Sequence, residues 1–575
     1  MPKKSVAAVI VDLLAGVGVE RVYGVAGDSL NGITDAIFSR DDLAWIHVRH
    51  EETGAFAAGA EAHLTGKLCV CAGSCGPGHL HLINGLYDSH RSRVPVLAIA
   101  AHIPSREIGS GYFQETHPER LFAGCSHYCE TIAHPAQVPR ILEIAIQTAV
   151  GKSGVAVIVL PGDVALQPAE RSVPRVRVRY EAPSICASET DLSDAARLLN
   201  AARKVTILAG AGCRGAHAEL VAAADALAAP IVHAMRGKEF VEYDNPFDVG
   251  MTGFLGFASG YLAMEDCDTL LMLGTDFPYQ QFFPEHATTI QVDLRKEQLG
   301  RRARLDLGIV GDVTTTLRAL IPRLTRKTDR AHLEASLAHY RRSRQGLDDL
   351  ATGSPGTHPI HPQFVARTLD ALASADAVFT CDVGTPTVWA ARYLTMNGRR
   401  RLLGSFTHGS MANALPQAIG AQLAHPTRQV ISMSGDGGLA MLLGDLLSLQ
   451  QLRLPVKVVV FNNASLGFVQ LEMRAAGFLD RGVHLTNPDF ARIAEAAGML
   501  GLSVDRSEQV QPALERALAY DGPALIDVRV NTQELVMPPS LQLEQVGGFA
   551  LYMAKAVLSG RGDELVDLAR TNLFR

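Results

Sequence analysis

Two short motifs in the last third of the chain constrain its fold most strongly. Gly435-Asp436-Gly437 follows an apolar segment (428–434), and the pair Asn462-Asn463 follows a second one, residues 456–461. The glycines allow a tight turn, so that the Asp436 carboxylate projects from the end of the first strand. Because residues 439–452 between them have helical character, we expect both motifs at neighbouring strand ends of one parallel sheet.

The chemistry of these two motifs points to a bound diphosphate. A carboxylate and an amide oxygen at adjacent strand ends suit Mg²⁺, which completes its octahedron with phosphate and water. Backbone N–H groups beside the glycines can hold the phosphates. A lone Gly-Asp-Gly is usually just a turn, but with Asn-Asn at this distance it resembles the diphosphate motif of thiamine diphosphate (ThDP) enzymes.

Length and composition are those of a large globular enzyme. A chain of 575 residues should form about three or four domains. Its net charge of −6 gives no reason to expect nucleic acid as a partner. No apolar run reaches the ~20 residues of a spanning helix, and the N-terminus lacks a signal-peptide pattern. The nine cysteines have no regular metal-site spacing, so we expect buried, reduced thiols in a cytoplasmic protein.

The chain divides into three units of alternating strands and helices, followed by a tail. This alternation predicts an α/β fold of three parallel sheets. The expected domains are residues 1–183, 184–335 and 336–533, and the tail is 534–575.

A carboxylate in the first unit is a candidate partner for the other end of the cofactor. Glu51 belongs to an Arg-His-Glu-Glu run (49–52) between a strand-like segment and an alanine-rich helix. ThDP enzymes need an acid beside the aminopyrimidine ring, which promotes loss of the thiazolium C2 proton. The alternative is an ordinary helix N-terminus, where acidic residues are favoured by the helix dipole. We favour the catalytic interpretation because the diphosphate motif is also present.

The resemblance extends over the whole chain and is more specific than ThDP enzymes in general. Its clearest segments are GDSLN, GSCGPG, SGYFQETHP, DVGTPTVW and GRGD, at 27–31, 73–78, 110–118, 382–389 and 560–563. They resemble the bacterial quinone-linked pyruvate dehydrogenases, membrane-associated pyruvate oxidases with ThDP, Mg²⁺ and FAD. That family implies oxidative decarboxylation of pyruvate to acetate and CO₂ through a ThDP enamine, with two electrons passing to FAD and then to ubiquinone.

The same resemblance implies the assembly and location of the protein. The family is homotetrameric, and each site joins the first unit of one chain to the third of its neighbour. It lies in the cytoplasm and, as a peripheral protein, on the cytoplasmic face of the inner membrane.

The resemblance also implies roles for residues in the first and third units. Glu51 would activate the pyrimidine, and Asp436 and Asn463 would bind Mg²⁺. Phe113 and Gln114 would lie beside the substrate. Phe468, expected in a loop, would either enter the site or plug the core. The ThDP-contacting residues would be Gly409, Ser410, Met411, Asp436, Gly437, Gly438, Asn463, Ala464, Ser465, Leu466, Gly467, Phe468 and Val469, with Met411 wedged between the cofactor rings.

The second unit is expected to bind FAD. Gly210-Ala-Gly212 is too short for a dinucleotide fingerprint, so this expectation rests on resemblance. The flavin-contacting residues would be Thr252, Gly253, Phe254, Leu255, Thr275, Asp276, Phe277, Pro278, Tyr279 and Asp293. Asp293 ends a predicted strand, where a carboxylate can accept from ribose or adenine donors. Asp276 could instead be a helix cap.

The tail is expected to bind a phospholipid membrane surface. Leu565, Val566, Ala569 and Leu573 form one apolar helix stripe, which can lie in a membrane interface or pack on its own domain. From residue 534 onward the chain has four basic and five acidic residues, a net charge of −1. Attraction to anionic lipid is therefore not the main force, and apolar insertion must provide the membrane binding. We expect the tail to be docked at rest and released when the flavin is reduced.

Two other enzyme classes share the three-unit plan. An acetohydroxyacid synthase would keep FAD as a structural group and condense two keto acids. A phosphate-dependent pyruvate oxidase would pass electrons to oxygen and form acetyl phosphate. Neither accounts for the tail.

Overall fold

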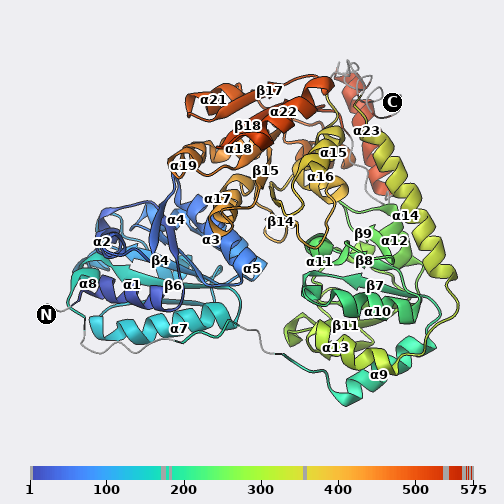
Figure 1. Cartoon of the computed structure of the whole chain (residues 1–575), viewed down its shortest axis with the longest axis horizontal. Helices are drawn as coiled ribbons and strands as arrows, with labels where there is room; N and C mark the ends of the chain where they lie inside the picture. Colours follow the sequence, from blue (N-terminus) through green and yellow to red (C-terminus); the bar gives the residue numbers. More distant parts are fainter. Residues whose placement is uncertain are drawn as a thin grey trace.

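The protein is built from three α/β units, each around a six-stranded parallel sheet. The structure, a computed structural model, describes residues 4–169, 177–180, 184–353, 359–534 and 543–559, and positions 565, 568 and 572. Figure 1 shows the first unit in blue, the second in green, and the third, in orange and red, above them. This architecture confirms the predicted fold class.

The first sheet has the strand order β2-β1-β3-β4-β6-β5. Its strands are β1 (Arg21–Gly24), β2 (Ala44–His47), β3 (Cys69–Gly73), β4 (Val96–His102), β5 (Tyr128–Thr131) and β6 (Val155–Pro161). β4 and β6 are buried throughout and apolar except for His102 at the end of β4, because helices cover both faces of the sheet. Those helices are α1 (Val6–Gly16), α2 (Asn31–Phe38), α3 (Glu51–Thr65), α4 (Pro77–His81), α5 (Ile83–Ser92), α6 (Pro118–Leu121), α7 (Val138–Gly151) and α8 (Gly162–Leu166).

The second sheet has the order β12-β11-β10-β7-β8-β9. Its strands are β7 (Val205–Ala209), β8 (Ile231–His233), β9 (Asp248–Met251), β10 (Thr269–Leu273), β11 (Thr288–Asp293) and β12 (Leu307–Val310). The helices are α9 (Glu189–Ala201), α10 (His217–Leu227), α11 (Lys238–Val241), α12 (Ala258–Glu265), α13 (Val313–Leu320) and the long α14 (Ala331–Leu350). The charged segment after residue 325 is therefore largely a helix.

The third sheet has the order β14-β13-β15-β16-β18-β17. Its strands are β13 (Val378–Cys381), β14 (Arg401–Gly404), β15 (Val430–Gly435), β16 (Lys457–Asn462), β17 (Leu500–Val504) and β18 (Ala524–Arg529). The helices are α15 (Pro362–Leu372), α16 (Thr385–Tyr393), α17 (Ala414–Ala424), α18 (Asp436–Met441), α19 (Leu446–Gln451), α20 (Gly467–Ala475), α21 (Phe490–Ala496) and α22 (Ser507–Ala519).

The helix expected over residues 439–452 is broken in two, which corrects the sequence prediction. α18 and α19 are separated by a 3-10 turn, Leu443–Asp445. The buried Asp445 carboxylate accepts hydrogen bonds from the Arg49 N–H (2.9 Å) and the Thr53 hydroxyl (2.7 Å) of the first unit. These contacts with the first unit favour the turn at Leu443–Asp445. Local sequence periodicity cannot predict them, because the partners are far apart in the chain.

Helix α3 carries alanine and glycine because it is enclosed by the sheet, α5 and α17. A Cβ on Gly420 of α17 would lie 2.1 Å from the Ala57 carbonyl oxygen, and one on Gly59 would lie 2.3 Å from the Ser89 hydroxyl of α5. Larger side chains cannot fit at these approaches. The first and third units consequently share one hydrophobic core.

All three units meet at the buried carboxylate of Glu239, on α11. It pairs with Arg401 of the third unit (2.7 Å), and His63 of the first unit lies 3.6 Å away. Burial raises the pKa of Glu239, but His63 and the Arg401 guanidinium outweigh it and hold that pKa at about 2. The Glu239 carboxylate is therefore ionised at neutral pH and paired with Arg401.

Glu239→Gln is expected to lower the melting temperature at pH 7 by roughly 5–10 °C, because it leaves Arg401 partly buried without its partner. A carboxylate whose folded pKa is depressed stabilises the fold above its unfolded pKa, about 4.5. The difference between variant and wild type should therefore be constant from pH 7 to 5 and shrink as the pH falls from 4.5 towards 2. Thermal melts at several pH values measure it. The control is Glu219→Gln, whose partner Arg318 is exposed; an equal loss in that variant would contradict the prediction.

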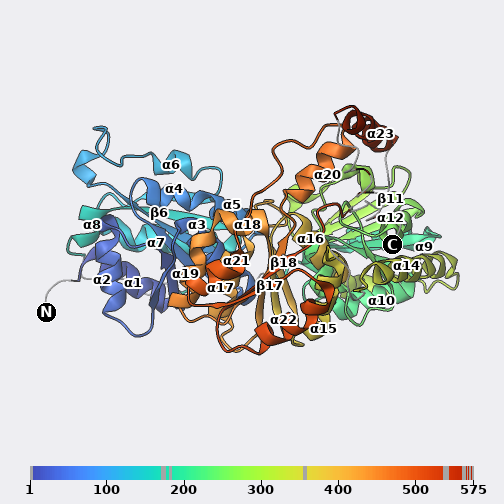
Figure 2. The ribbon, with the colours of Figure 1, turned by 90° about the horizontal axis from the view of Figure 1, so that it is seen from above.

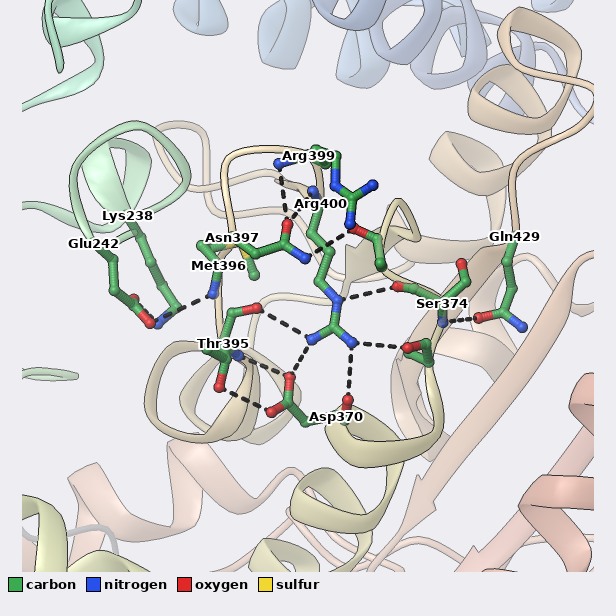
Figure 3. A network of polar contacts seen from close by, with 12 residues as sticks. Lys238, Glu242, Asp370, Ser374, Thr395, Met396, Asn397, Arg399, Arg400 and Gln429 are labelled. Carbon is green, nitrogen blue, oxygen red and sulfur yellow. Dashed lines mark hydrogen bonds and ion pairs between the residues drawn. The ribbon is translucent and has the colours of Figure 1, made fainter. Parts of the chain in front are cut away.

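A polar network around Arg400 fixes the loop between α16 and β14 (Figure 3). The buried Arg400 guanidinium donates to Asp370 at 2.6 Å and to the Ser374 carbonyl at 3.1 Å. Glu242 of the second unit accepts from the Met396 N–H and pairs with Lys238. The second and third units are therefore joined by hydrogen bonds as well as by apolar contacts.

The last described helix is α23 (Leu543–Leu558), which packs on α20, as Figure 2 shows. Of the predicted tail stripe, only Leu565 lies within the described residues; Val566, Ala569 and Leu573 lie outside them. No helix in the described part is long and apolar enough to cross a membrane.

The nine cysteines are all free, as predicted. Cys186 is exposed and Cys129 is half-buried, so the expectation of burial is wrong for these two.

Candidate cofactor site

The two diphosphate motifs lie at neighbouring strand ends of the third sheet. Asp436 is the first residue of α18, directly after β15, and Asn463 follows β16. The two strands are hydrogen-bonded neighbours, with Gly435 opposite Phe461. Both side chains are buried, with exposed fractions of 2% and 7%. The predicted metal ligands therefore lie at the same edge of the sheet, where α/β proteins bind ligands.

The surroundings of Asp436 fit a cation. Its carboxylate accepts a hydrogen bond from the Asn487 side-chain amide at 2.6 Å, a neutral donor. Burial raises the pKa of Asp436, since a buried carboxylate without a nearby positive charge is costly. Mg²⁺ would supply that charge, and the oxygens of Asp436 and Asn463 are the hard ligands it prefers.

The predicted ThDP-contacting residues of the third unit gather around this edge. A Cβ on Gly437 would meet Leu466 at 2.9 Å and the Met411 side chain at 3.3 Å. One on Gly438 would lie 2.4 Å from the Asp382 carboxylate, so only glycine fits there. Gly409, with φ +86°, has open space where its Cβ would be. The backbone at Gly437 and Gly438 thus lies close to its neighbours and Gly409 has open space beside it, a segment whose N–H groups are suited to holding the cofactor's phosphates.

Helix α20 begins directly after the second motif. Ala464 takes a left-handed conformation (φ 53°), and the Ser465 N–H donates to the Asn463 side-chain oxygen at 3.1 Å. Phe468 and Val469 lie in the first turn of α20, not in the loop that the sequence suggested for Phe468. Phe468 packs partly against the core of the third unit, whereas Val469 is 42% exposed.

Glu51 lies where the sequence places it, at the junction of β2 and α3. It is the first residue of α3 and is 8% exposed. Its Oε2 is 2.9 Å from the Nδ1 of His81, at the end of α4. A Cβ on Gly78 would lie 2.5 Å from the Ser74 hydroxyl and 3.2 Å from Glu51 Oε1, so only glycine lets the segment 73–78 approach this carboxylate so closely. The acid is thus buried and oriented by an imidazole.

The cluster of His50, Glu51 and His81 is better suited to orienting a carboxylate than to binding a metal. One potential ligand atom from each lies within 4.8 Å of the others. The two imidazole rings, however, stack at 4.3 Å with planes only 25° apart. Because nitrogen lone pairs lie in the ring planes, those of stacked rings run side by side instead of converging on one ion. His50 is also engaged as the α3 cap, accepting from the Glu52 N–H.

Phe113 and Gln114 lie on the loop between β4 and α6. Phe113 is 78% exposed in the single chain, and Gln114 has a left-handed backbone (φ 63°). The Gln114 side-chain oxygen accepts from the Cys75 thiol at 3.2 Å, and Gly76 approaches its Cβ closely. Gln114 therefore touches the same glycine-rich segment that borders Glu51.

The residues expected to contact FAD lie at the carboxyl ends of β9, β10 and β11. Gly253 (φ +90°) lies against Phe277, and the rings of Phe254 and Tyr279 pack edge to face at 4.7 Å. The buried Thr252 hydroxyl has no hydrogen-bond partner. An unpartnered hydroxyl beside an aromatic cluster fits a large, flat, polar-edged ligand.

The two aspartates of this region differ in their surroundings. Asp276 pairs with Arg302 (2.8 Å) and with Arg93 of the first unit (3.4 Å), so it is an ion-pair residue and not a helix cap. Burial raises the pKa of Asp293 to about 7, opposed by Arg93. Asp293 Oδ1 accepts from the Arg295 N–H at 3.0 Å, so Oδ2 is the candidate acceptor for a ligand's hydroxyl groups.

Sequence reasoning missed His81 and Asn487. His81 ends α4, directly after the glycine-rich segment, and a histidine at that place is the one sequence signal that could have identified it. Asn487 also donates to the Asn462 side-chain oxygen at 2.9 Å, but it follows an irregular segment. No local sequence pattern predicts the position of Asn487 in the site.

Comparison with known proteins agrees with this arrangement. Three thiamine pyrophosphate enzyme models match in order: the N-terminal TPP binding domain at residues 4–121, the central domain at 192–320, and the C-terminal TPP binding domain at 382–528. These matches place one domain model on each of the three sheets.

Similar curated proteins cover nearly the whole chain. The "Putative thiamine pyrophosphate-containing protein YdaP" of Bacillus subtilis (strain 168) is 37% identical over 99% of both chains. The pyruvate oxidase of Lactiplantibacillus plantarum is 32% identical over 93% of this chain and 90% of its own. The acetolactate synthase isozyme 2 large subunit of Escherichia coli (strain K12) is 30% identical over 92% and 96%. The chain is therefore a ThDP-dependent enzyme and belongs to the thiamine pyrophosphate enzyme family that includes pyruvate oxidases and acetolactate synthases.

Proposed function

We propose that the protein is a quinone-linked pyruvate oxidase. With water and a quinone, pyruvate would yield acetate, CO₂ and the quinol. ThDP supplies the electron sink for decarboxylation, and FAD would accept the two electrons before the quinone. In this chain, Glu51 would exchange the proton at the pyrimidine, Asp436 and Asn463 would hold Mg²⁺, and Gln114 would orient the keto acid.

The observation that carries this proposal is the docking of α23 on α20, the helix that follows the Mg²⁺ motif. Lys555 donates to the Gly477 carbonyl at 2.7 Å, and the Arg474 guanidinium lies over the Tyr552 ring at 5.2 Å. A Cβ on Gly548 would lie 2.0 Å from the Ala475 carbonyl, so the two helices touch closely. A C-terminal helix in this position can respond to the state of the cofactor site.

The outer side of α23 is apolar and exposed. Met553, Val557 and Leu558 are exposed, the last by 88%, and Phe478 beside Lys555 is 60% exposed. Such a surface favours insertion into the acyl boundary of a membrane. We propose that this region reaches the phospholipid surface and that the electrons leave the flavin there for ubiquinone, at the cytoplasmic face of the inner membrane. A homotetramer remains the proposed assembly.

A variant truncated after Glu534 should lose quinone reduction and vesicle binding but still reduce its flavin with pyruvate. This end point retains the Glu534–His361 pair at 2.8 Å, so the third unit keeps its closing contact. The measurements are sedimentation with neutral phosphatidylcholine vesicles, with and without pyruvate, and anaerobic flavin absorbance.

A less disruptive double variant, Val557→Ser with Leu558→Ser, should weaken vesicle binding. It leaves the contacts of Tyr552 and Lys555 with α20 and its C-terminal end in place. Serine at the exposed Ile144 and Leu447, far from α23, is the matched control. Continued sedimentation of the truncated, reduced protein would refute the membrane role of the tail.

The similarity to acetolactate synthase makes a synthase the second candidate. Anaerobic mixing with pyruvate separates the two activities. Bleaching of the flavin identifies an oxidase, whereas an unchanged flavin with acetolactate formation identifies a synthase.

A further inference from the structure

One face of α5, in the first unit, receives the loop that carries Met411. Asn84, Tyr87, Asp88 and Arg91 have the i, i+3, i+4, i+7 spacing of a single helix face. Each of them contacts the segment 405–410 of the third unit. Ser405 donates to Asp88 at 2.8 Å, Arg91 donates to the Thr407 carbonyl at 3.2 Å, and the rings of Tyr87 and His408 stack 5.6 Å apart.

Asn84 makes the central contacts of this face. Its amide nitrogen donates to Glu52 Oε1 at 2.8 Å and to the Ser410 hydroxyl at 3.0 Å. Its amide oxygen is 2.8 Å from Nε2 of His408. The reverse amide orientation would place two oxygens against each other at Glu52, so the hydrogen bonds fix the direction of the group. Both donors and the acceptor of Asn84 are therefore in use.

The hydrogen bonds continue from Asn84 to the backbone of Met411. The Ser410 hydroxyl, which accepts from Asn84, donates its one hydrogen to the Met411 carbonyl at 2.8 Å. Met411 in turn lies beside Gly437 of the diphosphate motif. Burial lowers the pKa of His408, so this imidazole is neutral and donates from Nε2 to Asn84. The hydrogen bonds thus run in one direction from His408 through Asn84 and Ser410 to the Met411 carbonyl, and Asn84 donates a second bond to Glu52, next to Glu51.

We propose that Asn84 is a positioning residue that sets the Met411 loop for ThDP by directing the Ser410 hydroxyl onto the Met411 carbonyl. It would act through Ser410 and would not touch the cofactor itself. The inference rests on the proposed function only in taking the Met411 loop as a ThDP contact, and ThDP binding can be measured without pyruvate turnover.

Asn84→Asp tests the direction of the chain, because the two side chains have the same shape. The carboxylate would face Glu52 and demand the Ser410 hydrogen, which then leaves the Met411 carbonyl. We expect the half-saturating ThDP concentration to rise about tenfold, since one hydrogen bond near a charge is lost and one reversed. Ser410→Ala removes the hydroxyl that accepts from Asn84 and donates to the Met411 carbonyl, and it should raise the ThDP half-saturation similarly, with an unchanged melting temperature of the apo-protein. Asn200→Asp, in the second unit, loses a comparable hydrogen bond to the Arg323 carbonyl; it is the control and should leave the ThDP half-saturation unchanged.

A double variant, Asn84→Asp with Glu52→Gln, separates positioning from simple attachment. The new amide at 52 can donate to the new carboxylate at 84, which restores the tie to α3 and the melting temperature. The Ser410 hydrogen still points at residue 84, so the ThDP half-saturation should stay raised. Titrations of apo-protein with ThDP at saturating Mg²⁺, read by near-ultraviolet circular dichroism, give the result.

The outcomes are distinct. Raised half-saturation in Asn84→Asp, Ser410→Ala and the double variant supports the proposal. Normal ThDP binding in Ser410→Ala, or recovery of binding in the double variant, would show that Asn84 is only a structural tie and would overturn it. A wild-type protein that does not oxidise pyruvate would defeat the proposed function, yet these titrations would still decide the role of Asn84.

Discussion

Glu51→Gln is expected to lose roughly 10²–10⁴-fold in pyruvate turnover while retaining its fold and its binding of Mg²⁺ and ThDP, because a positioned acid–base group contributes about that factor. Glutamine has the size of glutamate and can still meet His81, 2.9 Å away in the wild type. It cannot exchange a proton. Steady-state assays with an artificial electron acceptor, combined with ThDP titrations, measure the two properties separately.

The matched control for this variant is Glu189→Gln. Glu189 opens α9 as Glu51 opens α3, but it lies on the surface of the second unit. The control should keep wild-type turnover. Near-native activity of Glu51→Gln would show that the proton is exchanged by another group, with His81 the first to examine.

Asp436→Ala is expected to raise the half-saturating concentrations of ThDP and Mg²⁺ together by roughly 10–100-fold, since Mg²⁺ loses its charged ligand and the diphosphate its bridge to the protein. At saturating cofactor, much of the turnover should return, which distinguishes this variant from Glu51→Gln. Titration of apo-protein with each cofactor at a fixed excess of the other gives the measurement.

Removal of Asp436 also abolishes its contact with Asn487, so a control for local disturbance is needed. Asn487→Ala removes that contact but leaves the carboxylate. It should change cofactor affinity less than Asp436→Ala does. If Asp436→Ala binds both cofactors normally, Mg²⁺ is held elsewhere.

The strand ends were predictable because both motifs follow apolar segments that only a buried parallel strand explains. Gly435 ends β15 and Asn462 ends β16, as the sequence pattern indicates. Glu51 could be placed for the same reason, since a polar run after a strand and before an alanine-rich helix locates a junction. The local sequence pattern is therefore enough to place a site residue that directly follows a strand.

Other parts of the site depend on contacts between distant segments, which local pattern does not record. The break between α18 and α19 places Asp445 against Arg49 and Thr53, almost four hundred positions earlier. Phe468 was expected in a loop, yet α20 starts one residue before it. The residue at which a helix begins after a strand depends on what its first turn packs against. One packing partner of α20 is α23, which lies far along the chain.

The enclosure of α3 determines which side of the cofactor site can move during turnover. Gly59 and Gly420 leave no free space around this helix, so Glu51 at its N-terminus cannot shift without disturbing the shared core. Helix α20 has one open side, where Val469 is 42% exposed, although the buried Arg474–Asp480 pair at 2.8 Å anchors its C-terminal end. Segments with few buried contacts open at the lowest free-energy cost. Glu51 is thus held in place by the shared core, and motions that admit substrate or release product are expected on the exposed side of α20 instead.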